Sequence, residues 1–168
     1  MNKEFEVTDE MCCSSGKRIL NYIIDMVVIY AIIFLLMIIA LFITTLIGTD
    51  RLAIWMSNIS DGEAYLLIFG IFFPYYTFME YFFSKTVSKF ITQSKVVMED
   101  GSTPSLGTAF KRPLCRLIPL EFISFFGAYS RGWHDSITGS YVVNSKDFDS
   151  QMKQFYEFDQ IGKQVENE

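Results

Sequence analysis

The sequence is poor in the residues that build metal and redox sites. Only three cysteines and one histidine occur among its 168 residues. Cys12 and Cys13 are adjacent, which disfavours a disulfide between them. A zinc site from the cysteines and His134 is the weaker alternative, because a single histidine without a second ligand at suitable spacing is poor evidence for a metal. We therefore expect no metal, no cofactor and no disulfide framework.

Motifs of soluble chemistry are also missing. The chain has no phosphate-binding glycine loop, no GxSxG nucleophile elbow and no HExxH zinc motif. Its basic residues lack the interleaved aromatic side chains that are typical of nucleic-acid binding. The N-terminal segment carries acidic residues before its first apolar run, which is not the pattern of a secretory signal peptide. We expect neither an enzyme nor a nucleic-acid-binding protein.

Long apolar runs dominate the chain instead. Hydrophobic residues make up 51% and aromatic residues 17% of it, more than a soluble domain of this size needs for its core. Residues 26–43 carry no charge, and the run extends over 19–47 if Asp25 is tolerated. Residues 64–79 form a second uncharged run. As helices extended by their flanking residues to 17–47 and 64–84, both can cross a hydrocarbon core of about 30 Å. The sequence therefore predicts a multi-pass integral membrane protein.

The predicted fold is an all-α membrane protein with transmembrane helices at about 17–47 and 64–84. A third segment, within 105–128, is interrupted by charges and prolines, which suits a short re-entrant or interfacial helix. A full crossing is the alternative. Residues 95–98 and 140–144 are strand-like, and two lone short strands are expected to pair as a small two-stranded cytoplasmic β-ribbon.

The chain divides into three predicted parts: a cytoplasmic N-terminal segment (1–15), the membrane domain (16–145) and an acidic polar tail (146–168), expected to be frayed helix or disordered. Lysine and arginine number three before the first apolar helix, one between the helices and five after the second. Since cytoplasmic loops are enriched in these residues, the N-terminus is predicted to be cytoplasmic. Strand pairing would place the C-terminus there too.

Charged residues occur within and beside the apolar segments. Arg18 and Asp25 are seven residues apart, so they share a helix face with Asn21. Antiparallel packing would bring Glu80 to the depth of Asp25, where an ionised carboxylate needs a partner or water. We predict Asp25 and Glu80 as ion- or proton-binding residues. The expected cluster partners are Arg18, Asn21, Arg112, Arg116, Glu121, His134 and Asp135.

Two functions are compatible with this pattern. The first is a proton-coupled monovalent cation transport component that uses Asp25 and Glu80, because buried intramembrane carboxylates build ion and proton relays. Two spans are few for a transport path, so this function predicts a homo-oligomer in the lipid bilayer. The second is a non-catalytic membrane scaffold or assembly factor, whose charge cluster is structural and whose cytoplasmic face binds a protein partner.

Four parts of the sequence, in this order, resemble the RDD family of small bacterial membrane proteins. They are GKRILNYIID at 16–25, KTVSKFITQSKVVMEDGSTPSL at 85–106, the pair Arg112 and Arg116, and GWHDSITGSYVV at 132–143. The resemblance implies that Arg18, Asp25 and Asp135 are the arginine and the two aspartates for which the family is named. It further implies a location in the bacterial inner membrane. It brings no settled activity, although cation/proton exchange has been suggested within the family.

Overall fold

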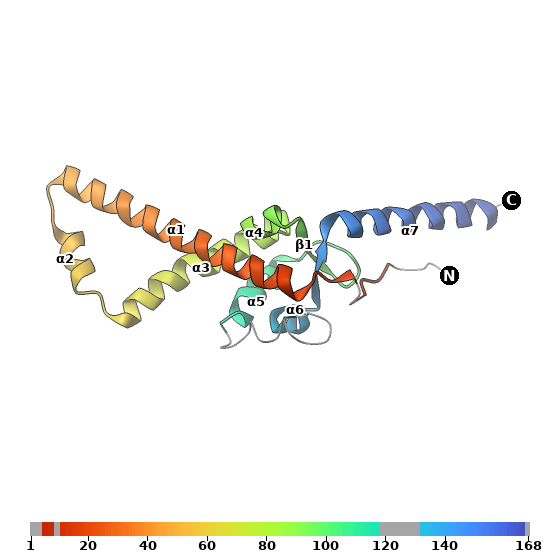
Figure 1. The fold of residues 1–168 in the computed structure, drawn as a ribbon, viewed down its shortest axis with the longest axis horizontal. Coiled ribbons are helices and arrows are strands. Elements are labelled where there is room, and N and C mark those ends of the chain that lie inside the picture. Colours follow the sequence, from red (N-terminus) through yellow and green to blue (C-terminus); the bar gives the residue numbers. More distant parts are fainter. Residues whose placement is uncertain (1–4, 9–10, 118–131, 167–168) are drawn as a thin grey trace.

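Two long helices form an antiparallel hairpin that sets the long axis of the molecule. The structure, a computed structural model, describes residues 5–8, 11–117 and 132–166. Helix α1 (Ser15–Ile47) and helix α3 (Asp61–Phe83) are joined by the short helix α2 (Arg51–Ser57). They diverge toward α2, whereas the strands and the remaining helices gather at the opposite end (Figure 1). Both α1 and α3 are long and apolar enough to cross a membrane, so both predicted helices are present as candidate membrane spans.

Helix α1 has two halves with different surroundings. Its 33 residues extend about 50 Å at 1.5 Å per residue, which exceeds a hydrocarbon core of about 30 Å. The buried residues Arg18, Asn21, Asp25 and Ile29 form one stripe along its N-terminal half. In the C-terminal half large apolar side chains are exposed. The first half therefore packs one face on protein and exposes apolar side chains such as Ile23 and Val27 on the others, whereas the second half exposes them almost throughout.

The two ends of α3 explain how the chain reverses. At its start Ser60 Oγ accepts a hydrogen bond from the Glu63 N–H, and the Glu63 carboxylate accepts one from the Ser60 N–H. At its end Ser84 adopts a left-handed conformation with φ of 54°. The Ser84 carbonyl accepts a 2.8 Å hydrogen bond from Val96 N–H. This turn brings the chain back toward α1 and starts the next elements.

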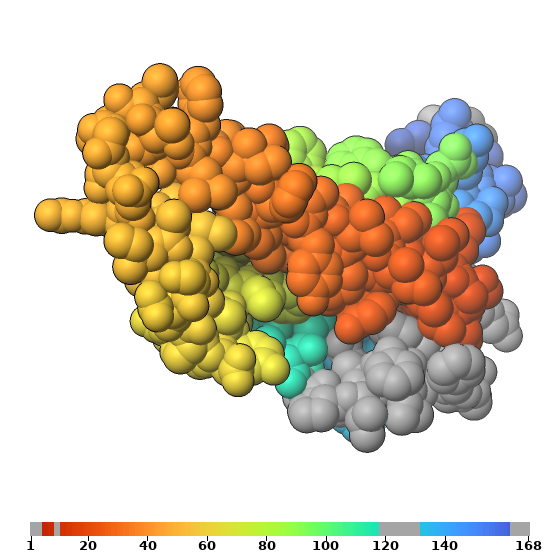
Figure 2. Space-filling model, turned by 60° about the vertical axis from the view of Figure 1, so that its left-hand side comes forward, coloured from red at the N-terminus to blue at the C-terminus, as the bar shows by residue number. Residues whose placement is uncertain are grey.

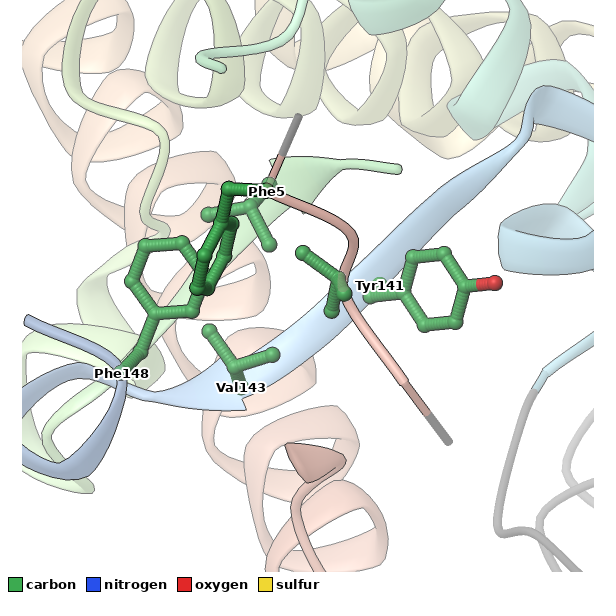
Figure 3. Packing of buried hydrophobic residues seen from close by; sticks show 6 residues of the cluster. Phe5, Tyr141, Val143 and Phe148 are labelled. Atoms are coloured by element: carbon green, nitrogen blue, oxygen red, sulfur yellow. The ribbon is translucent and has the colours of Figure 1, made fainter. Parts of the chain in front are cut away.

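The predicted β-ribbon is confirmed as a two-stranded antiparallel sheet. Strands β1 (Ser94–Met98) and β2 (Ser140–Asn144) pair over their whole length. On one face the cross-strand pair Val96 and Val142 packs with Cys13. On the other face Val97, Tyr141 and Val143 form an apolar core with Phe5, Val7 and Phe148 (Figure 3). Both faces of this small sheet are thus covered.

Both terminal segments contribute to that cover. The Val7 N–H donates to the Glu99 carbonyl, and the Cys13 N–H donates to the Val142 carbonyl, so the N-terminal segment lies along the sheet. The acidic tail, expected to be frayed helix or disordered, forms helix α7 (Ser145–Glu166) directly after β2. Its first turn buries Phe148, Met152 and Phe155 pack against the same core, and the C-terminal part of the helix extends away from the body (Figure 1).

Three short helices surround the end of the hairpin that holds the sheet. They are α4 (Val87–Ile91), α5 (Leu106–Cys115) and α6 (Trp133–Thr138). Ser105 caps α5 by accepting a hydrogen bond from the Thr108 N–H. The helix predicted within 105–128 is described only as far as Cys115, and a turn follows. Residues 118–131, where the re-entrant part and Glu121 were expected, lie outside the described residues.

Candidate functional site

Glu80 is the best-paired acidic residue of the buried charge cluster. It lies in the last turn of α3 and is fully buried. Lys89 Nζ from α4 donates to Glu80 Oε1 at 2.7 Å, and Arg112 Nε from α5 donates to Oε2 at 2.6 Å. Arg116 Nη2, just after α5, donates to Oε1 at 3.1 Å. Both carboxylate oxygens are therefore already engaged by cationic side chains.

Asp135, in the first turn of α6, is the second acidic centre and is also fully buried. Arg112 Nη1 donates to its Oδ1 at 2.6 Å, and Arg18 Nη1 from α1 donates to Oδ2. Since Arg112 also binds Glu80, one guanidinium joins the two carboxylates. Arg112 further donates to Ser140 Oγ of β2. The network therefore ties α1, α3, α5, α6 and the sheet to one another.

His134 precedes this aspartate and is buried beside it. Its Nε2 lies 3.2 Å from Asp135 Oδ1 and 3.3 Å from Arg116 Nη2. Burial lowers the pKa of His134 well below its usual value, although Asp135 acts in the opposite direction. Burial also opposes ionisation of Asp135, yet the guanidinium groups of Arg18 and Arg112 hold the pKa of that carboxyl well below its usual range. At neutral pH the pair is an aspartate next to a neutral imidazole.

Asp25 has different neighbours. It lies in α1 and is only 1% exposed. Its Oδ1 accepts hydrogen bonds from the Tyr75 hydroxyl at 3.0 Å and from the Ser88 N–H at 3.2 Å. Among the residues that the structure describes, no lysine, arginine or histidine forms an ion pair with it. Asp25 and Glu80, predicted to lie at one depth, therefore have separate sets of partners.

A small cavity borders the unpaired carboxylate. Its volume is about 20 Å³, and its polar lining residues are Arg18, Asn21, Tyr22, Asp25, Lys89, Arg116 and His134. A cavity of this size can hold one water molecule. Nε and Nη2 of Arg18, and Nε of Arg116, are buried and have no acceptor within the described part of the chain. A water in this cavity would find both donors and an acceptor.

The structure brings together the predicted residues that it describes. Asn21 lines the cavity with Arg18 and Asp25, and its amide also donates to Ser94 Oγ and accepts from Thr92 Oγ1, which ties α1 to the start of β1. Glu121 lies outside the described residues. Over the described ranges no group of three or more histidine, cysteine, aspartate or glutamate side chains could hold a metal ion.

Sequence reasoning missed Lys89, Tyr75 and Ser88. The sequence identifies Lys89 only as one of the five basic residues that follow the second span. It reaches Glu80, nine residues earlier, because the turn at Ser84 folds α4 back onto the end of α3. A lysine so close in sequence to a predicted buried carboxylate was the one signal that could have found it.

The comparisons with known proteins agree with the features of the sequence. Residues 13–139 match the family model described as the RDD family. The matched range includes α1, α3 and all the charged residues of the cluster. No curated protein and no solved structure matches the chain. The resemblance inferred from the residues is thereby confirmed: the chain belongs to the RDD family, and its two long apolar helices indicate a membrane protein.

Proposed function

We propose that the protein is a proton-coupled monovalent cation transport component in which Asp25 binds the cation and Lys89 exchanges the proton. The observation that carries the proposal is the pairing pattern. Asp25 is buried without an ion pair among the described residues, and it shares a cavity with Lys89. Glu80, the second carboxylate expected from the sequence, has both oxygens occupied by cationic side chains and offers no ligand to an incoming ion.

The charge of Lys89 controls whether a cation can bind. Burial lowers the pKa of Lys89 to about 8, although Glu80 acts to raise it. When Lys89 is protonated, the cavity wall carries three cationic side chains, those of Arg18, Lys89 and Arg116. They repel an incoming cation near Asp25. When Lys89 loses its proton, Glu80 keeps Arg112 and Arg116, and Asp25 can accept a cation. Proton and cation therefore exclude each other, which is the basis of exchange.

The proposal places the charge cluster on the cytoplasmic side of the bacterial inner membrane. Arg51 is the only lysine or arginine in the connector between the spans, whereas basic residues flank the other ends. α1 begins and α3 ends at the end of the molecule that carries the sheet and α7 (Figure 1). The N-terminus, the ribbon and the C-terminal helix then all face the cytoplasm. A path for ions would form between copies in a homo-oligomer.

The test is proton flux in proteoliposomes driven by a sodium or potassium gradient and followed with an internal pH-sensitive dye. Lys89→Arg keeps a positive charge beside Glu80, but arginine does not deprotonate near neutral pH. We expect this variant to reduce flux to the background of empty liposomes. Lys95→Arg is the matched control, since Lys95 pairs with Asp149 outside the cavity, and it should retain flux. Asp25→Asn should also abolish flux while the protein stays folded.

Two results would contradict the proposal. The first is an unmodified protein without any cation-dependent proton flux. The second is a Lys89→Arg variant as active as the unmodified protein. Size-exclusion profiles in detergent must show that each variant is folded, so that loss of flux is not a loss of protein.

A scaffold or assembly factor is the second candidate. It is favoured by the ion pairs of Glu80 and Asp135, whose carboxylate oxygens are all bound by basic side chains. Most of the cluster would then serve to hold the helices together. The cytoplasmic face would bind the protein partner through α7, where Tyr156, Phe158 and Ile161 are exposed. Here Asp25→Asn should lower thermal stability, and in-cell crosslinking should recover one specific protein that Phe158→Ser fails to recover. Recovery of only the chain itself would count against this candidate.

A further inference from the structure

A large apolar cavity lies between the diverging parts of α1 and α3 and the short helix α2. Its volume is about 430 Å³, within the usual range of ligand pockets, roughly 300–1,000 Å³. All of its lining residues are apolar, among them Ala40 from α1, Trp55 from α2 and Ala64 from α3. Figure 2 shows the surface recessed between the orange part of α1 and the yellow part of α3. It is separate from the charge cluster at the other end of the hairpin.

The position of this cavity along the two spans places it next to the hydrocarbon of the membrane. The lining residues on the two long helices lie within 33–40 and 64–71, inside the uncharged runs of the two spans. Several of them also form the outer surface: Leu36, Met37 and Leu67 are 49%, 40% and 47% exposed. The cavity therefore continues into the surface that faces lipid. Water has no polar partner within such walls, so hydrocarbon is the favoured occupant.

We propose that this cavity binds one acyl chain of a membrane phospholipid. The exposed residue Arg51 begins α2, directly before Leu52, which lines the cavity. A lipid whose chain lies between the helices would have its phosphate at the level of this connector, where a guanidinium is a suitable partner. The acyl chain supplies the dispersion contacts that the separated helices do not make with each other. The site is independent of ion transport.

The protein contains its own reporter for this site. Trp55 lines the cavity, and the second tryptophan, Trp133, lies in α6 beside the charge cluster. In a Trp133→Phe variant all tryptophan fluorescence comes from Trp55. Detergent-purified protein is titrated with phosphatidylcholine that carries bromine in its acyl chains, because bromine quenches tryptophan on contact. We expect saturable quenching at one lipid per chain.

Two matched variants separate the cavity from the general lipid surface. Ala40→Phe fills the cavity from α1, whereas Ala31→Phe adds the same ring at an exposed position of α1 outside it. We expect the first to weaken saturable binding by about tenfold or more, and the second to leave it unchanged. Quenching that rises linearly without saturation, or that is equal in both variants, would overturn the proposal. So would a dimer whose contact shields Trp55 from the brominated lipid.

Discussion

The two ends of the α1–α3 hairpin are held in different ways. At one end, buried ion pairs join helices and sheet through Glu80 and Asp135. At the other, the helices separate around an apolar cavity, and large apolar side chains are exposed. Lipid tails replace apolar protein contacts at little cost, whereas a buried charge without its partner is strongly unfavourable. The comparison indicates that the charged end carries most of the stability and that the apolar end only has to suit the bilayer.

The largest effect is expected from removing the residue that joins the two acidic centres. Arg112→Met leaves Glu80 without one of its three cationic partners and Asp135 without one of its two. The expected loss is about 3–5 kcal/mol of unfolding free energy. Thermal unfolding in detergent, followed by near-UV circular dichroism, measures it. The control is Lys95→Met, which breaks a partly exposed pair with Asp149 and should cost about 0–1 kcal/mol. Equal losses would refute the comparison.

The next effect concerns the apolar core of the ribbon, which belongs to the charged end. Phe148→Ala removes a ring that is 2% exposed and packs edge-on against Phe5, with 5.6 Å between centroids. We expect a loss of about 3 kcal/mol, measured by the same unfolding assay. Phe158→Ala on the same helix, at a residue 73% exposed, should change stability by less than about 0.5 kcal/mol. A small loss of stability in Phe148→Ala would mean that the ribbon does not contribute to the stability of the charged end.

Acid should weaken the charged end selectively. The pKa of His134 is lowered by burial in the folded state, so below pH 6.5 only the unfolded chain takes up this proton. Stability should therefore fall steadily as the pH is lowered from 7 to 5. The contribution of Asp135, whose folded-state pKa is depressed, is fully present above its unfolded value and is lost as pH falls through the folded one. Unfolding midpoints measured against pH test this, and His134→Gln should remove the first decline.

The smallest effect is expected at the apolar end. Leu46, near the end of α1, is 70% exposed, and in a bilayer it contacts lipid. Leu46→Ala should change the unfolding free energy by no more than about 0.5 kcal/mol, because lipid fills the space of the lost side chain. Ile29→Ala, buried against Phe72 and Tyr76, should cost more. Similar losses at both positions would show that the outer part of α1 packs on protein.

Helices and strands could be predicted from the sequence where neighbouring residues alone specify them. The length of the apolar runs placed the first helix at 17–47, and it occupies Ser15–Ile47. The strands at 95–98 and 140–144 pair as expected, because each lacked any other partner in the sequence. For the acidic tail the sequence left frayed helix and disorder open, and the structure has a helix there. Its first turn depends on the burial of Phe148 against Phe5, a contact between residues at opposite ends of the chain.

By itself the sequence determined the membrane-spanning character, the ribbon and which charged residues must avoid lipid. Hydrocarbon penalises an unpaired charge or an unsatisfied backbone wherever it occurs, so these features follow from composition and spacing alone. Only the tertiary structure decided the partners. The turn at Ser84 brings Lys89 within hydrogen-bonding distance of Glu80. The position of α6 brings Asp135 into an ion pair with Arg18. Asp25 is left with a hydroxyl, a backbone amide and a cavity, since ion pairing depends on distances of a few ångströms that sequence spacing does not specify.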